Sequence, residues 1–194
     1  MKTALLIGLM ILFNTISQAG IIDDFAVKQR SIDRGTDNLA TATYKKVESN
    51  GQIPEYTRQL VSYTPDGDLN YTDSLIYKRG LFITNRIVEG HSVGSGTSVI
   101  YCFNNFDLYG SANGFYLKLG ETIGNGFVII STNGPAGFSY SNFHSITDGY
   151  LYFPLTEFNG ARLFNNINWI RIDFVNVDNY SGPIEFGLID KNKR

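Results

Sequence analysis

The chain has 194 residues, of which 43% are hydrophobic, 14% aromatic and 18% charged. This length and apolar content suit one domain with a sizeable core, and they exclude a disordered chain. The formal net charge of -2 gives no general attraction to polyanions, so nucleic acid is not an expected partner.

Residues 1–19 have the pattern of a secretory signal peptide. Lys2 precedes an apolar run at 4–13, which is too short to span a bilayer, and Ala19 completes the small-residue pattern that a signal peptidase reads. We expect cleavage after Ala19, a mature domain at 20–194, and a secreted or periplasmic location. No later window is long and apolar enough for a membrane span, so we expect the protein not to be membrane-embedded.

Alternation of apolar and polar residues with a period of two dominates the rest of the chain. Short segments rich in β-branched and aromatic residues are separated by turns containing Gly, Asn and Pro. The expected strands are 39–47, 52–63, 79–88, 98–106, 114–119, 126–131, 150–155, 168–175 and 184–189. This pattern predicts an all-β fold, a single antiparallel β-sandwich that is jelly-roll-like.

The segment 66–73 holds the best candidate for a metal site, because alternating oxygen side chains begin it as they begin a calcium loop. The ligands would be Asp66, Asp68, Asn70 and Asp73. Tyr71 stands where such a loop needs Gly, and Tyr77 stands where it needs a bidentate Glu. A Pro-Asp-Gly hairpin turn is the alternative interpretation. Calcium is the one cofactor that the pattern allows.

Catalytic chemistry finds little support in the sequence. Cys102 is the single cysteine and lies in an apolar segment, so we expect no internal disulfide and a buried, unreactive thiol. The two histidines, His91 and His144, show no zinc-ligand spacing, and no nucleophile motif accompanies them. We therefore assign no catalytic residue.

The loop at 138–145 has the composition of a sugar-binding loop. Tyr140 and His144 offer flat rings that stack on sugar C–H faces, and Asn142 offers an amide that binds hydroxyl groups. The alternative is that these aromatic side chains cover the open end of the sandwich.

The strand expected at 168–175 provides a second candidate ligand surface. Ile170, Ile172 and Phe174 are predicted to face the core, which places Trp169 and Arg171 on the opposite face. If that face is solvent, this pair is a candidate for ligand contact. The alternative is that Trp169 packs under a loop or against a second sheet.

Three short motifs stand out from the strand pattern: IIDDFAV at 21–27, KRGLFI at 78–83 and LFNNINWIRI at 163–172. They resemble the "IDDF" opening and two strands of exported bacterial β-sandwich proteins, a group in which many members carry a PEP-CTERM sorting signal. No such signal follows Ile189, so surface sorting is not implied, and the group carries no agreed activity. The overall design is also similar to galactose-binding-like jelly rolls, which suggests carbohydrate as a ligand class by analogy.

These observations favour an exported, non-catalytic module that binds a polysaccharide, another glycan or a different extracellular polymer. A structural protein that associates with its own kind through β-edges is one alternative. A carbohydrate-active hydrolase or lyase is the other, and it requires two carboxylates that meet in a cleft. The six candidate carboxylates are Glu48, Glu55, Glu89, Glu121, Glu157 and Glu185. The oligomeric state does not follow from the sequence.

Overall fold

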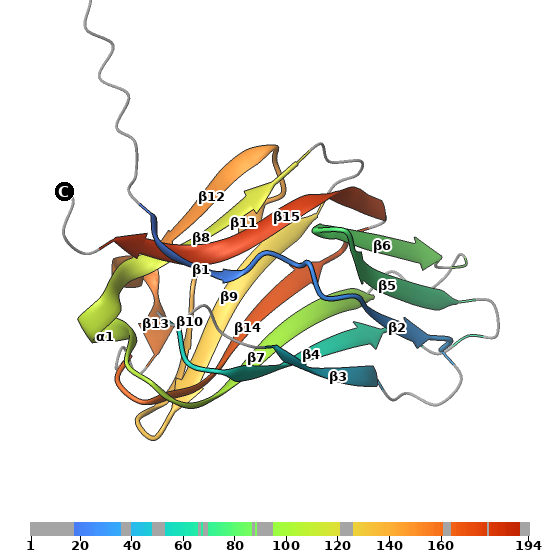
Figure 1. Ribbon diagram of the computed structural model, residues 1–194. Helices are drawn as coiled ribbons and strands as arrows, with labels where there is room; N and C mark the ends of the chain where they lie inside the picture. The colour runs from blue at the N-terminus through green and yellow to red at the C-terminus, as the bar shows by residue number, and fades with distance from the viewer. Residues whose placement is uncertain are drawn as a thin grey trace, which may run out of the picture.

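The computed structural model describes residues 18–35, 40–47, 53–65, 67, 70–86, 88, 95–120, 126–160, 164–177 and 179–190. Two antiparallel sheets pack face to face, which confirms the expected all-β sandwich (Figure 1). The chain changes sheet at most of its links after β6, as in a jelly roll.

Sheet I contains, in spatial order, β12 (Gly149–Pro154), β8 (Ala112–Leu119), β15 (Asn179–Asp190), β6 (Gly80–Arg86), β5 (Tyr71–Tyr77) and β2 (Gln29–Asp33). The long strand β15 pairs with β6 along its first half and with β1 (Gln18–Asp23) along its second half. The N-terminal strand therefore takes the place beside β15 that β6 leaves.

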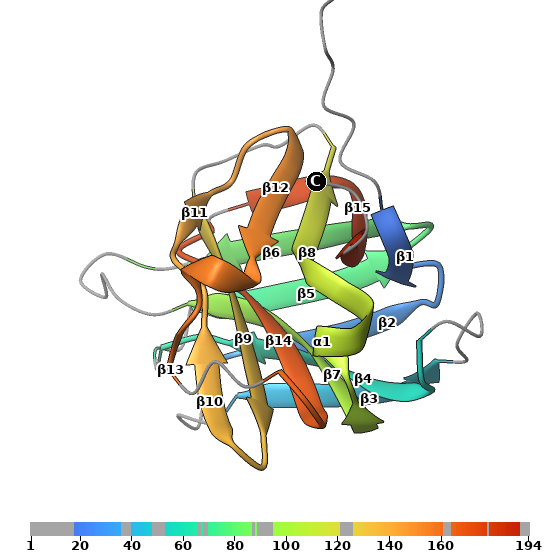
Figure 2. The same ribbon diagram turned by 90° about the vertical axis from the view of Figure 1, so that its left-hand side faces the viewer.

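Sheet II contains, in spatial order, β13 (Asn159–Gly160), β10 (Gly137–Tyr140), β9 (Phe127–Gly134), β14 (Ile167–Val175), β7 (Gly96–Phe106), β4 (Tyr56–Tyr63) and β3 (Thr41–Val47). The short strand β11 (His144–Ser145) pairs with β9. A one-turn helix, α1 (Leu108–Ser111), joins β7 to β8 at one end of the sandwich (Figure 2), and a 3-10 turn, η1 (Leu155–Glu157), follows β12. No helix within the described ranges has the length and apolarity of a membrane span.

At the α1 end, the space between the sheets is filled by aromatic rings. Tyr101 of β7 stacks on Phe186 of β15 with ring centroids 5.3 Å apart, and Phe186 stacks on Phe115 of β8 at 5.6 Å. All three side chains are fully buried. Burial of a ring of this size contributes roughly 1.5–3 kcal/mol, so these contacts account for much of the cohesion between the sheets.

At the opposite end, the space between the sheets is polar. The hydroxyl of Ser62 on β4 bonds to that of Ser74 on β5 at 2.8 Å, and Ser74 bonds to Thr97 on β7 at 2.7 Å. All three residues are buried. Because each of these three hydroxyls has a partner, their burial avoids the cost of unpaired polar groups.

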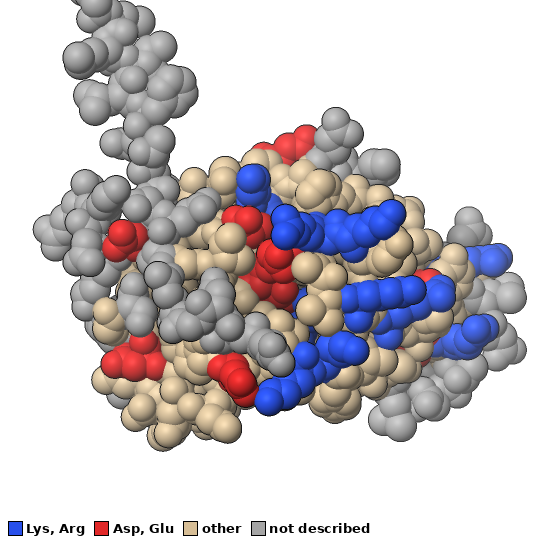
Figure 3. Space-filling model, in the orientation of Figure 1, with Lys and Arg blue, Asp and Glu red and all other residues tan. Residues whose placement is uncertain are grey.

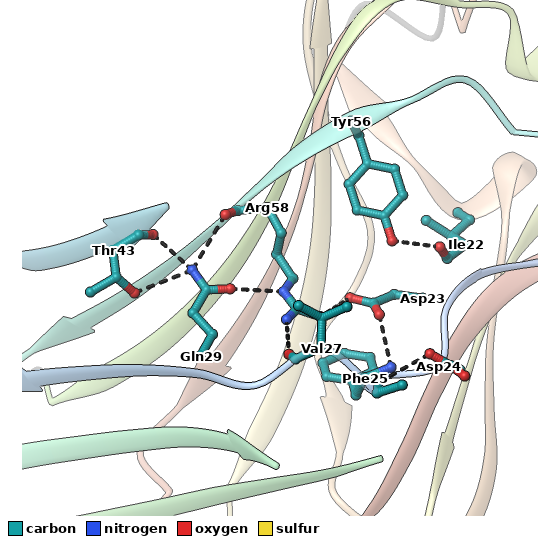
Figure 4. A network of polar contacts seen from close by, with 10 residues as sticks. Ile22, Asp23, Asp24, Phe25, Val27, Gln29, Thr43, Tyr56 and Arg58 are labelled. Atoms are coloured by element: carbon teal, nitrogen blue, oxygen red, sulfur yellow. Dashed lines mark hydrogen bonds and ion pairs between the residues drawn. The ribbon is translucent and has the colours of Figure 1, made fainter. Parts of the chain in front are cut away.

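Between these two regions lies the Arg58 network, which consists of Arg58, Asp23, Gln29 and the Phe25–Val27 segment (Figure 4). Arg58 of β4 is fully buried, and its Nη1 donates to Asp23 Oδ2 of β1 at 2.6 Å. Its Nε donates to Gln29 Oε1 of β2 at 2.8 Å, and its Nη2 donates to the Val27 carbonyl. One side chain of sheet II thus binds the two N-terminal strands of sheet I.

The IDDF motif supplies the acidic half of this network. Asp23 Oδ1 accepts the backbone N–H of Phe25 at 2.8 Å, which holds a tight turn in which Phe25 has φ of +55°. The Phe25 ring is buried, and the Arg58 guanidinium lies 5.7 Å from its centroid. Burial raises the pKa of the Asp23 carboxyl, and the charge of Arg58 acts in the opposite direction.

Replacing Arg58 with Met should destabilise the protein by about 3–5 kcal/mol, because Asp23 would then be a buried charge without its cation. The double variant Asp23→Asn/Arg58→Met should be more stable than Arg58→Met alone. The matched control is Arg30→Met, which removes an Arg whose side chain is 55% exposed from its pair with Asp73, and it should cost less than about 1 kcal/mol. Urea unfolding of the four proteins measures these differences, and equal losses for Arg58→Met and Arg30→Met would contradict the role given to the network.

Alkaline pH should destabilise the fold through its buried tyrosines. Burial raises the pKa of Tyr56, Tyr101, Tyr116 and Tyr180 above the ordinary value of 10.0. Above that pH, the unfolded chain has released protons that the folded chain still holds, so the free energy of unfolding falls as the pH rises. In a titration toward alkaline pH, tyrosinate absorbance should show a step above pH 10.0 that coincides with the loss of near-ultraviolet circular dichroism. If the absorbance step and the loss of circular dichroism occurred at different pH values, this expectation would be contradicted.

Candidate functional site

The outer face of sheet II carries an unusual share of exposed rings. Eleven large hydrophobic side chains are exposed in the described part of the chain, and six of them lie on or beside this face. These six are Tyr44, Tyr63, Phe127, Phe138, Tyr140 and Phe143. Two pairs of these rings are in contact, Phe127 with Phe143 and Phe138 with Tyr140, which makes this face the candidate for ligand binding.

The register of sheet II sets these side chains in rows, because paired residues of neighbouring strands lie side by side. One row contains Phe138, Asn133, Trp169, Cys102 and Thr57. The next row contains Tyr140, Ser131, Arg171, Ile100 and Gln59. The two-residue turn between Gly134 and Gly137 folds β10 back on β9, which brings Phe138 into the row of Trp169.

Trp169, Phe138 and Tyr140 form the aromatic platform of this face. The Phe138 ring lies 5.8 Å from Trp169 and 5.8 Å from Tyr140, measured between centroids. Phe138 is 49% exposed and Tyr140 is 41% exposed. Their contacts hold the rings in place while leaving apolar ring surface open to solvent.

Next to this platform is a polar triad of Arg171, Asp173 and Ser98. The Arg171 Nε donates to Asp173 Oδ1 at 2.6 Å, and its Nη2 donates to Ser98 Oγ at 3.1 Å. The Ser98 hydroxyl also donates to Asp173 Oδ1. The guanidinium is therefore fixed in position, although the Arg171 side chain is 45% exposed.

The triad forms part of a surface groove of about 540 Å³. Apolar side chains of Tyr63, Ile129, Phe143 and Val175 also line it. Platform and groove together follow β14 from Trp169 to Val175, which is roughly 20 Å at the usual rise of a strand. We call this combined surface the groove face.

The structure brings together three of the five ligand residues expected from the sequence. Tyr140, Trp169 and Arg171 lie on the groove face, in adjacent rows. Asn142 is exposed in the link between β10 and β11. His144 lies apart from them, because its ring packs 4.4 Å from the ring of buried Phe153.

His144 contacts Glu157, one of the candidate carboxylates of the hydrolase alternative. His144 Nε2 lies 2.9 Å from Glu157 Oε1, and both side chains are mostly buried. Of the other candidate carboxylates, Glu48, Glu89 and Glu121 lie outside the described residues. Glu55 pairs with Lys46 at 3.0 Å, and Glu185 accepts a hydrogen bond from the Tyr116 hydroxyl at 2.9 Å. No catalytic pair is assigned on this geometry.

The expected calcium ligands lie only partly within the described residues. Asp66 and Asp68 are outside them. Asn70 Nδ2 donates to the Pro65 carbonyl at 3.2 Å, and Asp73 is not in a loop but on β5, where both of its oxygens accept bonds from Arg30. Among the residues that the structure does describe, no three His, Cys, Asp or Glu side chains cluster as metal ligands. Calcium binding stays a prediction.

Cys102 corrects an expectation, because its thiol is exposed and not buried. The alternation of β7 turns Tyr101 and Phe103 toward the core and Cys102 outward, beside Trp169 in the same row. The apolar neighbours that suggested burial belong to the other face of the strand. Partial burial still raises the pKa of this thiol.

Cys102 should therefore react with iodoacetamide in the folded protein. The rate at neutral pH should be below that of a free thiol, because the raised pKa lowers the fraction of thiolate. Mass spectrometry of protein alkylated with and without urea measures this difference. Modification that requires urea would contradict the outward position of Cys102.

Comparisons with known proteins add two solved structures. No protein-family model matches the chain, and no curated protein sequence matches it. A family 11 carbohydrate-binding module of a cellulosomal cellulase of Clostridium thermocellum is similar with a TM-score of 0.41 and 13% identity, covering 90% of this chain and 95% of that one. A second structure of a family 11 module from Clostridium thermocellum, in complex with a β-1,3-1,4-mixed-linked tetrasaccharide, has a TM-score of 0.40 and 12% identity, covering 87% and 91%. No residue of the present chain takes a role from either structure.

Proposed function

We propose that the protein is an exported, non-catalytic module that binds a polysaccharide on the groove face. The observation that carries this proposal is the aromatic platform of Trp169, Phe138 and Tyr140, which lies next to the open groove that the Arg171 triad lines. Export rests on the signal-peptide pattern of residues 1–19.

The chemistry of the groove face matches that of a sugar chain. Sugar rings have apolar C–H faces and a rim of hydroxyl groups, so they stack on aromatic rings and bond to fixed polar groups. The platform offers the first kind of contact, and the Arg171–Asp173–Ser98 triad offers the second. A strip of roughly 20 Å along a strand has room for several sugar units of a linear chain.

The rigidity of this face favours binding without a large entropic cost. Trp169, Arg171 and Asp173 alternate along β14 with Ile170 and Ile172, which are fully buried beneath them. Strands that are packed on one face hold the side chains of the other face in position, so little freedom is lost when a ligand binds.

Trp169→Ala should weaken binding to the preferred polysaccharide at least tenfold, because removal of a central aromatic anchor is among the most costly changes at a binding surface. A glycan array selects the polymer, and affinity electrophoresis in gels that contain it measures the loss. The matched control is Tyr150→Ala, which removes a ring that is 40% exposed on sheet I. This variant should bind like the parent.

Intrinsic fluorescence provides an independent measurement, since Trp169 is the only tryptophan. Titration of the parent with the selected oligosaccharide should change the emission of this residue, because the ligand would lie on its ring. Absence of binding to every polymer tested, or equal binding by Trp169→Ala and the parent, would overturn the proposal.

A further inference from the structure

The outer face of sheet I differs in character from the groove face. Its strands β2, β5 and β6, with the residues next to them, present six Lys or Arg side chains, and Figure 3 shows such side chains covering much of this side of the molecule. We call this surface the basic face. Its cations are Lys28, Arg30, Arg34, Lys78, Arg79 and Arg86.

Only part of this positive charge is neutralised within the described residues. The ion pairs found there join Arg30 to Asp73 at 2.6 Å and Arg79 to Asp24 at 3.3 Å. Asp24 and Asp73 are described carboxylates of this face, and Glu185 of the adjoining strand β15 lines a pocket together with Asp24 and Arg79. Among the described residues, the six cations of the basic face outnumber these three carboxylates, on a chain whose formal net charge is -2.

At the β5–β6 turn end of this face, two ammonium groups flank one exposed ring. Lys28 Nζ lies 5.4 Å from the centroid of Tyr77, and Lys78 Nζ lies 5.2 Å from it. Tyr77 is 41% exposed, and Phe82 on the neighbouring strand β6 is 36% exposed. The combination offers a flat ring and two cations to the same ligand.

The β5–β6 turn places Lys78 and Arg79 in a backbone conformation that is unfavourable for residues with a Cβ. Lys78 and Arg79 are the two central residues of a two-residue hairpin turn, and their φ angles are +51° and +60°. Turns with two positive φ values favour Asn-Gly, because a Cβ is disfavoured there. Lys-Arg is therefore less favourable for this turn than Asn-Gly would be.

We propose that the basic face binds an anionic polysaccharide, with sugar carboxylates on its Lys and Arg groups and a sugar ring on Tyr77. A membrane surface fits less well, because the large apolar side chains exposed on or next to these strands in the described part of the chain, Tyr77, Phe82 and Val88, are each less than half exposed. This site is separate from the groove face, which lies on the other sheet.

The test measures binding to polygalacturonate at low and high salt, with fully methyl-esterified polygalacturonate as the uncharged probe. The variant Lys78→Asn/Arg79→Gly removes two charges and supplies the preferred turn residues. Its melting temperature should be no lower than that of the parent. It should bind polygalacturonate at least fivefold more weakly, because one Lys or Arg facing an anionic surface contributes a factor of roughly five to the affinity. The parent should lose its binding at high salt and should not bind the ester.

The matched control, Lys45→Gln/Lys46→Gln, removes two charges from β3 of sheet II and should bind polygalacturonate like the parent. Trp169→Ala should also bind it like the parent, which separates this proposal from the function proposed for the groove face. Equal losses in the two double variants would show that overall charge alone matters and would overturn the proposal. So would absence of polygalacturonate binding at low salt, or a preference for vesicles of anionic phospholipid or for duplex DNA over polygalacturonate.

Discussion

The Arg58 network is the interaction on which the arrangement of the two sheets depends. A guanidinium that is 0% exposed carries a desolvation cost of several kcal/mol, and this cost is offset only when charge and hydrogen-bond partners are both present. Asp23, Gln29 and the Val27 carbonyl supply these partners from three points of the N-terminal segment. The position of β1 and β2 against β4 is therefore specified by geometry that apolar packing alone would not give.

The network also lies where the two halves of the core meet. On one side, stacked rings such as Tyr101 and Phe186 join the sheets, and on the other the hydroxyls of Ser62, Ser74 and Thr97 do so. Ring packing tolerates small shifts better than hydrogen bonds do, because bonds weaken steeply with distance and angle. The polar half thus fixes the register between the sheets, while the aromatic half provides most of the cohesion.

Alternation along the chain predicted nine of the fifteen strands found in the described residues, but not β1, β2, β5, β10, β11 or β13. It placed Ile170 and Ile172 inside and Trp169 and Arg171 outside, as the structure has them. It did not reveal that buried Arg58 would pair with Asp23, since two residues 35 positions apart meet only through the fold. It also missed Phe138 as the neighbour of Trp169, because that contact depends on the order of β10, β9 and β14, which no local pattern contains.

The net charge of the whole chain did not reveal that the two outer faces differ in character. A net charge of -2 suggested indifference to polyanions, yet the described cations of β2, β5 and β6 gather on one side of the sandwich. Screening limits the field of these charges to about 8–10 Å at ordinary salt, so a ligand on one sheet experiences little of the charge on the opposite face. Two sheets about 10 Å apart can therefore present an aromatic groove on one side and a cationic surface on the other without interference. The distance between the two outer faces and the salt in the solvent make the surfaces independent, because a packed core without mobile ions does not itself screen charge.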